Sequence, residues 1–294
     1  MILLGHNKCR GLPGVSFGGI ALQSSTAKKL KDLKTHIGEY GSAAVAFSGG
    51  VDSTLLAFVT HDVLGNNMVA ITSAGKVVTQ RDISRTQLFC KENGIRHEVL
   101  DFDELSVEGF SNNPPDRCYV CKRAIFKRIV DTARQYGIEH VLDGSNLDDR
   151  GDYRPGMRAL AELGIHSPFL EAGIGKEEIR EISHELGLPT WDMPSSACLA
   201  SRIAYGVSIS EDLLRRVEAS EEFLHDKGYT QVRVRVHGGK GEIARIEVEA
   251  KDIARLNSET EREEVVLTLK GFGFAYVCAD LLGFRSGSMN NVLA

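Results

Sequence analysis

The loop at residues 48–53 constrains the fold most, because it joins an apolar segment to a helix through two adjacent glycines. It reads Ser-Gly-Gly-Val-Asp-Ser and follows the apolar run at 43–47, a pattern typical of a buried parallel strand. Residues 54–59 predict a helix packed on that strand. Paired glycines let the backbone approach an anion closely, and a helix start offers unpaired N–H groups. The loop is therefore predicted to bind phosphate, although it lacks the spacing of a Walker A loop.

Strands and helices alternate along the first two hundred residues. This alternation predicts an α/β fold with a doubly wound parallel sheet, whose ligands bind at the carboxyl ends of the strands. The phosphate loop, Thr72 and residues 143–146 all follow predicted strands, so we expect them to converge on one crevice. Strands are predicted at 43–47, 68–72, 96–100 and 140–143, and helices at 26–40, 80–93 and 121–135.

The pattern changes near residue 206. Ser210 is a candidate N-cap for a charged helix that runs to residue 227. Residues 231–236 and 243–249 alternate in polarity, which predicts half-exposed antiparallel strands. Two further helices and a last strand complete an α+β unit. We expect an N-terminal arm at 1–24, a nucleotide-binding domain at 25–206 and a substrate-binding or oligomerisation domain at 207–294.

Composition places the chain among soluble globular proteins. Of its 294 residues, 42% are hydrophobic and 26% are charged, which is enough to build a full core. The net charge of −5 argues against a protein that coats nucleic acid. No apolar run reaches the length of a transmembrane span, and the first two dozen residues are too interrupted for a signal peptide. These features lead us to expect a cytoplasmic location without membrane partners.

Three of the six cysteines form a candidate metal or redox site. Cys118 and Cys121 have C-x-x-C spacing at a helix start, where Arg117 and Lys122 would favour thiolate. Cys198 lies far along the chain in a predicted loop. Three thiolates could hold three irons of a cubane cluster and leave the fourth iron open to hydrosulfide. A zinc site, which normally needs a fourth protein ligand, and a redox dithiol are the alternatives.

Several segments carry a family resemblance. The loop at 48–53 resembles the PP-loop of ATP pyrophosphatases, which grips the β,γ-pyrophosphate of ATP. Residues 194–206, reading P-S-S-A-C-L-A-S-R-I-A-Y-G, are similar to a loop of the LarE-type ATP-dependent sulfur transferases of nickel-pincer nucleotide synthesis. Residues 143–156 and 232–238 also resemble that family, and the similarity extends over about residues 25–294.

The resemblance implies a reaction and a substrate. ATP with Mg²⁺ would adenylate a carboxylate of pyridinium-3,5-dicarboxylic acid mononucleotide or its half-thiolated form, and sulfur would then displace AMP to leave a thiocarboxylate. Homo-oligomers are also implied. The implied ATP-binding residues are Ser48, Gly49, Gly50, Val51, Asp52, Ser53, Thr72, Gly144 and Asn146, with Asp52 as the candidate magnesium ligand.

Members of the family differ in their sulfur source. In some, a lone cysteine matching Cys198 gives up its own sulfur and becomes dehydroalanine. Others pair that cysteine with a C-x-x-C and carry a [4Fe-4S] cluster that delivers added sulfide. Because this chain has Cys118 and Cys121, the resemblance implies the cluster type, with Cys198 as a ligand. The sulfide donor is left open.

Three arginines are candidates for the substrate phosphate. Arg233 and Arg235 alternate along one predicted strand, so they share a face and could clamp a phosphate, unless that face is simply solvated. The resemblance favours phosphate. Arg202, four residues after Cys198, is either a ligand for a carboxylate or phosphate or a charge at a helix start.

Three other functions compete. A PP-loop tRNA thiolase would share the cysteines but would need a broad basic face for RNA. A nucleotide-binding protein with structural zinc would bind ATP without releasing pyrophosphate. A ligase that uses ammonia would have no use for Cys198.

Overall fold

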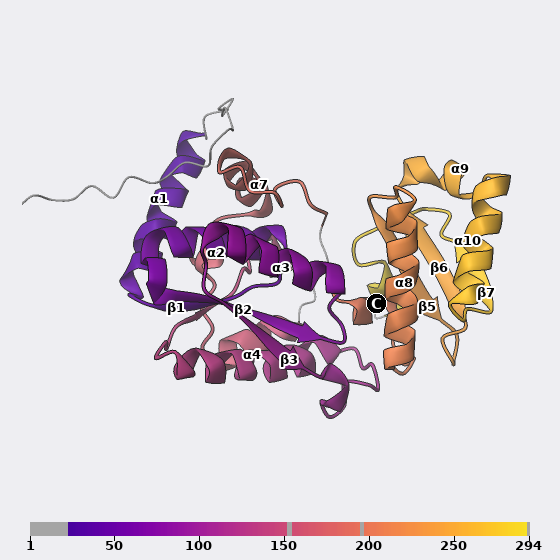
Figure 1. Cartoon of the computed structure of the whole chain (residues 1–294), viewed down its shortest axis with the longest axis horizontal. Helices are drawn as coiled ribbons and strands as arrows, with labels where there is room; N and C mark the ends of the chain where they lie inside the picture. The colour runs from indigo at the N-terminus through magenta and orange to yellow at the C-terminus, as the bar shows by residue number, and fades with distance from the viewer. Residues whose placement is uncertain (1–22, 152–154, 195–196, 293–294) are drawn as a thin grey trace, which may run out of the picture.

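The chain is built around two β-sheets, each covered by helices (Figure 1). The computed structural model describes residues 23–151, 155–194 and 197–292, so the predicted arm at 1–24 lies almost wholly outside the described residues. The first sheet has the order β3-β2-β1-β4, and its paired strands are parallel. The predicted parallel α/β sheet is confirmed. Its strands are β1 (Ala43–Ala46), β2 (Met68–Gly75), β3 (His97–Phe102) and β4 (Val141–Leu142).

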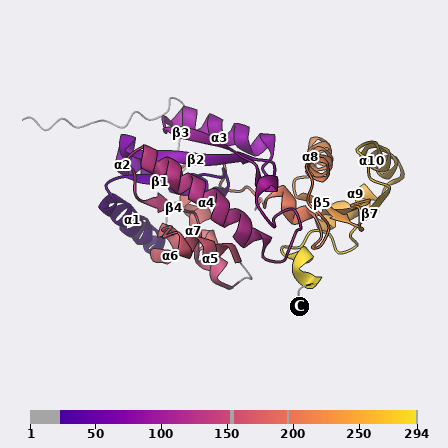
Figure 2. The ribbon, with the colours of Figure 1, turned by 90° about the horizontal axis from the view of Figure 1, so that it is seen from below.

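Helices cover both faces of this sheet. Successive side chains of a strand point to opposite faces, so Val45 packs with one core cluster and Ala44 with the other. Figure 2, seen from below, places α4 in front of the sheet. One face is covered by α1 (Ser24–Glu39), α2 (Val51–Leu64), α3 (Gln80–Asn93) and α7 (Lys176–Glu185), and the other by α4 (Arg117–Gln135) and α5 (Pro155–Glu162); α6 (Pro168–Glu171) follows α5.

Local signals explain both ends of α3 (Gln80–Asn93). The Thr79 side chain accepts a hydrogen bond from the Asp82 N–H at 3.0 Å and caps α3, which ends at Gly94 with φ +67°. Helix α4 begins four residues earlier than predicted, so Cys118 and Cys121 both lie near its start. Residues three apart are neighbours on a helix surface, which brings these two thiols to one side.

The second sheet has the order β5-β6-β7. Strands β5 and β6 are antiparallel, as predicted, while β7 runs parallel to β6. Strand β5 is buried from Val232 to Val236, so the prediction that it is half-exposed is wrong. Its arginines are buried among carboxylates instead of facing water. The elements are α8 (Glu211–Asp226), β5 (Val232–His237), β6 (Ile243–Val248), α9 (Ile253–Leu256), α10 (Glu259–Gly271) and β7 (Tyr276–Ala279).

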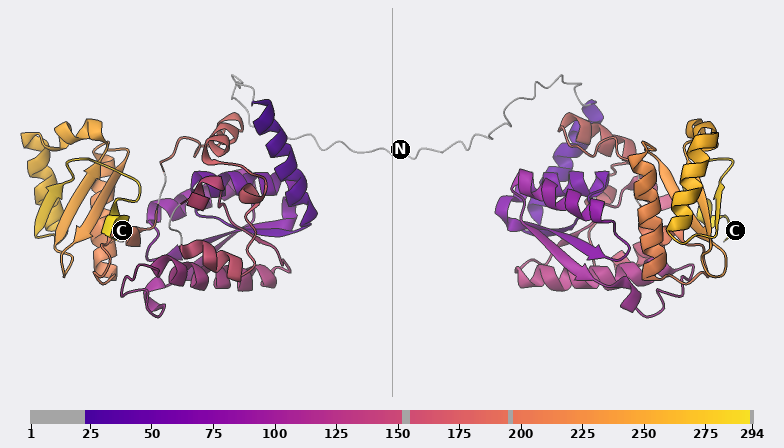
Figure 3. Two further views of the ribbon diagram at one scale, coloured as in Figure 1. Left: turned by 180° about the vertical axis from the view of Figure 1, so that it is seen from behind. Right: turned by 45° about the vertical axis from the view of Figure 1, so that its right-hand side comes forward.

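The carboxyl ends of the first sheet face the C-terminal unit (Figures 1 and 3). Val77 and Phe110, which follow β2 and β3 in the chain, belong to the hydrophobic core of the second unit. The Leu199 N–H donates to the Val77 carbonyl at 2.9 Å, and the Ile209 N–H donates to the Ser111 carbonyl at 2.8 Å. A site at these strand ends is therefore bordered by both units. No helix in the described part of the chain is long and apolar enough to cross a membrane.

Candidate functional site

The phosphate loop turns at Gly49, whose φ is +74°. A Cβ atom there would lie 2.8 Å from the Thr86 Cγ2 atom of α3, so both backbone conformation and space require glycine. Arg85, also on α3, donates from Nε to the Gly49 carbonyl at 3.3 Å. The loop is thus packed closely between the end of β1 and α3.

The two loop serines face each other. Ser48 Oγ lies 3.1 Å from Ser53 Oγ, and the Ser53 hydroxyl contacts the Gly50 carbonyl at 3.2 Å. Gly50 stands at the N-cap of α2 and offers no side chain to cap it, while Val51 is buried and anchors the first turn. The first-turn N–H groups and the positive end of a 14-residue helix can therefore serve an anion.

A lysine that sequence reasoning missed joins this loop. Lys176 Nζ lies 2.8 and 2.6 Å from the two carboxylate oxygens of Asp52, and Asn146 Nδ2 donates to Asp52 Oδ1 at 3.2 Å. A Cβ atom on Gly144 would lie 3.1 Å from the Ser53 nitrogen, so the chain after β4 packs directly on the loop. Lys176 is the first residue of α7, which was not predicted. The Gly175-Lys176 pair before two glutamates was the signal for that helix start.

Thr72 lies at the base of the loop, inside the sheet. It is buried, and its hydroxyl donates to the Phe47 carbonyl at 2.7 Å. The same oxygen lies 2.8 Å from His97 Nε2. Thr72 therefore braces the end of β1, just before Ser48.

The three cysteines come from two segments. Cys118 and Cys121 lie on α4, and Cys198 precedes a short 3₁₀ helix, η4 (Leu199–Arg202). Cys118 and Cys198 are exposed, while Cys121 is partly buried. The hydrogen bond from Leu199 to Val77, two residues beyond β2, places Cys198 at the same edge of the sheet as the phosphate loop.

The three thiols influence one another electrostatically. Cys118 is exposed, yet neighbouring protein atoms desolvate its thiol, and this desolvation raises the pKa of Cys118. The charge of Cys198 raises that pKa further, while Arg117 and Lys122 lower it. Burial raises the pKa of Cys121, and Cys198, Glu104 and Cys118 raise it further. A positive group such as a metal would reverse this cost of holding several thiolates together.

Arg202 is buried beneath Cys198. Its guanidinium makes two hydrogen bonds of 2.9 Å to Glu221 on α8, in the manner of a bidentate ion pair. It also donates to the Cys198 carbonyl at 3.0 Å and to the Ala197 carbonyl. Glu221 in turn accepts the Val234 N–H at 2.9 Å. Arg202 therefore ties the loop that carries Cys198 to α8 and β5.

Arg233 and Arg235 lie behind Arg202 in the second sheet. Arg235 donates to Glu247 Oε2 from Nε at 3.0 Å and from Nη2 at 2.9 Å. Arg233 donates to the Val232 carbonyl and stacks 5.5 Å from the Phe284 ring centroid. Burial, together with the charges of Arg202 and Arg235, lowers the pKa of Arg233 to about 10. Arg245 also pairs with Glu247 at 3.1 Å and with Asp280, so among the described residues four guanidinium groups gather with three carboxylates.

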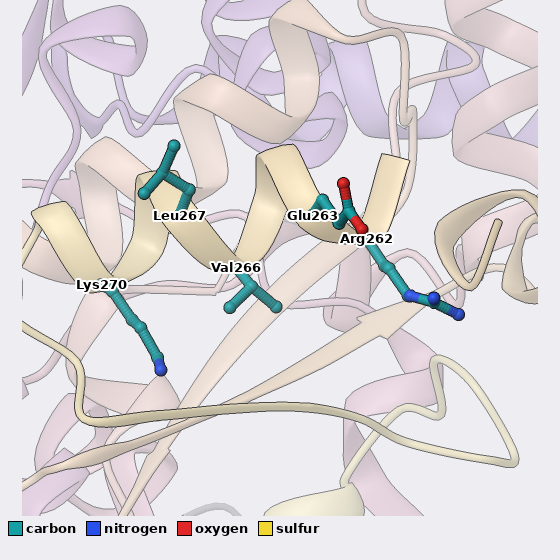
Figure 4. Close-up of a pocket in the computed structure, with 5 residues that line it drawn as sticks. All are labelled: Arg262, Glu263, Val266, Leu267 and Lys270. Atoms are coloured by element: carbon teal, nitrogen blue, oxygen red, sulfur yellow. The ribbon is translucent and has the colours of Figure 1, made fainter. Parts of the chain in front are cut away.

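Among residues 23–151, 155–194 and 197–292, no three His, Cys, Asp or Glu side chains lie close enough together to hold a single metal ion. Away from the cysteines, an open recess lies along α10, on the outer side of the C-terminal unit (Figures 1 and 4). Its lining residues are Arg262, Glu263, Val266, Leu267 and Lys270.

Comparisons with known proteins agree with the PP-loop geometry. The NAD synthase family matches residues 26–125. An uncharacterized protein of Synechocystis sp. is 42% identical over 90% of this chain and 98% of its own length. The pyridinium-3,5-bisthiocarboxylic acid mononucleotide synthase of Lactiplantibacillus plantarum is 36% identical over 92% of this chain and 96% of its own length. An uncharacterized protein of Methanocaldococcus jannaschii is 32% identical over 88% of this chain and 98% of its own length.

These relatives match this chain over nearly their whole length. The chain therefore belongs to the LarE family of PP-loop enzymes, the ATP-dependent sulfur transferases that include the L. plantarum synthase.

Proposed function

We propose that this enzyme adenylates a carboxylate of pyridinium-3,5-dicarboxylic acid mononucleotide and converts it to a thiocarboxylate. The name of the L. plantarum relative supports this substrate. The main support for the proposal is that the phosphate loop and Cys198 lie at the same edge of the parallel sheet. The loop around Gly49 suits the phosphates of ATP, and Cys198 is anchored beside the end of the neighbouring strand.

ATP binding would use the loop from Ser48 to Ser53, with Gly144 and Asn146 behind it. The carboxylate of the substrate attacks the α-phosphorus, an acyl adenylate forms and pyrophosphate leaves. We propose that, when ATP binds, Lys176 contacts its phosphates instead of Asp52. This exchange frees the Asp52 carboxylate for Mg²⁺. Thr72 supports the loop from inside the sheet.

Cys118, Cys121 and Cys198 suit a [4Fe-4S] cluster. Each cysteine of such a cluster binds a different iron, so the thiols need not meet at one point. Arg117 and Lys122 beside them would offset the negative charge of the thiolates. The cluster would supply an iron without a protein ligand, at which added sulfide can bind. Sulfur that attacks the adenylate carbonyl displaces AMP and leaves the thiocarboxylate.

The substrate phosphate is assigned to Arg233 and Arg235, with Arg202 adding charge from beneath Cys198. Because the charges of Arg202 and Arg235 lower the pKa of Arg233, a phosphate bound beside them would offset the mutual repulsion of these cations. We also propose a domain boundary near residue 206, because residues 25–206 hold the phosphate loop and residues 207–294 hold the second sheet.

We also propose a homo-oligomer and a cytoplasmic location. Five large apolar side chains in the described part of the C-terminal unit are more than half exposed, which favours a protein partner such as a second copy. Reduced cysteines suit a cytoplasmic enzyme. The exposed side chains are Leu267, Tyr276, Leu281, Leu282 and Val292.

The test combines product and metal analysis under anaerobic conditions. Purified protein is given ATP, Mg²⁺, sulfide and the mononucleotide, and pyrophosphate and thiocarboxylate are both measured. We expect several turnovers, about four irons per chain, and loss of both iron and thiocarboxylate in Cys118→Ala. The matched control is Cys278→Ala, on the exposed strand β7. Pyrophosphate release without thiocarboxylate would refute sulfur transfer. A single turnover without iron would instead make Cys198 the sulfur donor.

A further inference from the structure

Asn113 joins the two segments that carry the cysteines. It is fully buried, and it is the one non-glycine residue with positive φ, +52°, within the described ranges. Asparagine tolerates this conformation better than most residues do, because its short side chain can bond locally. Such strain persists only where the surroundings impose it, so the contacts of Asn113 explain its position.

The side-chain amide of Asn113 reaches the segment after Cys198. Its Nδ2 atom lies 2.8 Å from the Ala204 carbonyl, 3.0 Å from the Val207 carbonyl and 3.3 Å from the Ile203 carbonyl. Its own carbonyl accepts the Gly206 N–H at 3.2 Å. One residue thus binds the chain immediately beyond η4 from both its side chain and its backbone.

The other end of the amide points to the C-x-x-C. Arg117 Nη1 donates to Asn113 Oδ1 at 2.6 Å. Arg117 is buried at the start of α4, directly precedes Cys118 in the chain and stacks 4.5 Å from the Tyr205 ring centroid. A continuous path of contacts therefore runs from Cys118 through Arg117 and Asn113 to the segment that follows Cys198.

We propose that Asn113 is a positioning residue that sets the spacing between Cys198 and the C-x-x-C. It acts through Arg117 and the backbone and touches no reacting atom. The inference rests on the proposed function in one respect: the three cysteines must work as one site. Without Asn113, the Leu199–Val77 hydrogen bond would still hold the loop of Cys198 to the chain after β2, but that bond does not involve α4.

Two substitutions separate the roles of the amide. Asn113→Asp keeps the acceptor for Arg117 but removes the donor to the three carbonyls. Asn113→Gly keeps the positive φ and removes both contacts. Asn257→Asp is the chemical control, because Asn257 Nδ2 donates to a single exposed carbonyl, that of Ile253. Val217→Ala, at a fully buried position of α8, is the control for lost stability.

The experiment has two readouts on the full chain. In iron-free protein, a short two-armed thiol-alkylating reagent is added, and mass spectrometry measures cross-linking of Cys198 to Cys118 or Cys121. In a second sample, iron and sulfide are added without oxygen, and iron per chain and the visible absorption spectrum are recorded. We expect both Asn113 variants to lose cross-linking at least fivefold and to hold less than about one iron of the four a full cluster needs. Both controls should match the wild type, and the thermal midpoints of all variants are compared.

The outcomes are distinguishable. Cross-linking in the wild type that is lost in the variants supports the inference, even if no protein binds iron, a result that would contradict only the cluster in the proposed function. Wild-type cross-linking and iron content in both Asn113 variants would overturn the inference. So would absence of cross-linking in the wild type, since Cys198 would then not be held near α4. Equal losses in Val217→Ala would reduce the role of Asn113 to general stability and would also overturn it.

Discussion

Lys176 Nζ lies 2.6 Å from Asp52 Oδ2, so the first residue of α7 holds a carboxylate of the phosphate loop. The two residues are 124 positions apart in the chain. Both side chains are about one-quarter exposed, so solvent and ligands can reach the pair. A lysine poised in this way can exchange its carboxylate partner for a phosphate at little cost in ordering.

Replacing Lys176 by Met should weaken the use of ATP. A charge-assisted hydrogen bond contributes about 1.5–3 kcal/mol, so kcat/KM for ATP in pyrophosphate release should fall about 10- to 100-fold. Lys34→Met is the control, because Lys34 forms a 2.7 Å pair with Asp62 on the exposed surface of α1 and α2. An unchanged kcat/KM in Lys176→Met would show that this lysine serves only the ion pair.

Gly49→Ala should destabilise the protein and abolish pyrophosphate release. A positive φ costs a non-glycine residue about 1–2 kcal/mol, and the new Cβ atom would also meet Thr86. Gly41→Ala has a similar φ of +67° with open space around it, so it isolates the cost of the backbone conformation.

The clash at Gly49 can be relieved separately. Thr86→Ser removes the methyl group and keeps the hydroxyl that donates to the Ile83 carbonyl. The double variant Gly49→Ala/Thr86→Ser should therefore be more stable than Gly49→Ala alone. Its loss of unfolding free energy, measured in urea, should equal that of Gly41→Ala. No recovery in the double variant would contradict the packing argument.

Arg202→Gln should cost about 3–5 kcal/mol of unfolding free energy, because it leaves Glu221 buried without its cation. It should also lower thiocarboxylate formation more than pyrophosphate release, since Arg202 holds the carbonyl of Cys198. Arg215→Gln is the control, because Arg215 and Asp212 form an exposed pair at 3.9 Å that contributes less than about 1 kcal/mol. Similar losses of stability in the two variants would argue against the buried pair.

Stability should fall in mild acid, partly through His97. Burial lowers the pKa of His97 from 6.5, so the unfolded chain binds a proton more readily than the folded chain does. Its contribution is complete above about pH 6.5 and is lost as the pH falls towards the folded pKa. Urea unfolding of the wild type and His97→Gln from pH 5 to 8 measures it. A difference between the two proteins that does not change with pH would contradict this assignment.

Local patterns were sufficient to predict much of the fold. The apolar run before Ser48 and the Ser210 cap both act within a few residues, and the strand and the helix that they predict are present. The cysteine segments were also recognisable from the sequence. The start of α4 was misplaced because its first turn follows two prolines and lacks a capping hydrogen bond from Asp116.

The burial of Arg235 could not be predicted from the sequence. A polar residue at every second position of a strand predicts one solvated face, yet Arg235 is 6% exposed. The antiparallel register places Glu247 opposite Arg233 and diagonal to Arg235, so the carboxylate replaces water. This pairing depends on which strand lies alongside, and alternation along one strand carries no such information.

The sequence by itself determined the parallel sheet, the phosphate loop at its first strand and the cysteines available for chemistry, because these follow from periodicity and from neighbours in the chain. Only the tertiary structure decided that Lys176 reaches Asp52 and that Asn113 binds the segment beyond Cys198. These contacts join residues about 90 to 124 positions apart. They form because packing of both units brings distant backbone and side-chain groups together, where buried polar atoms must find partners.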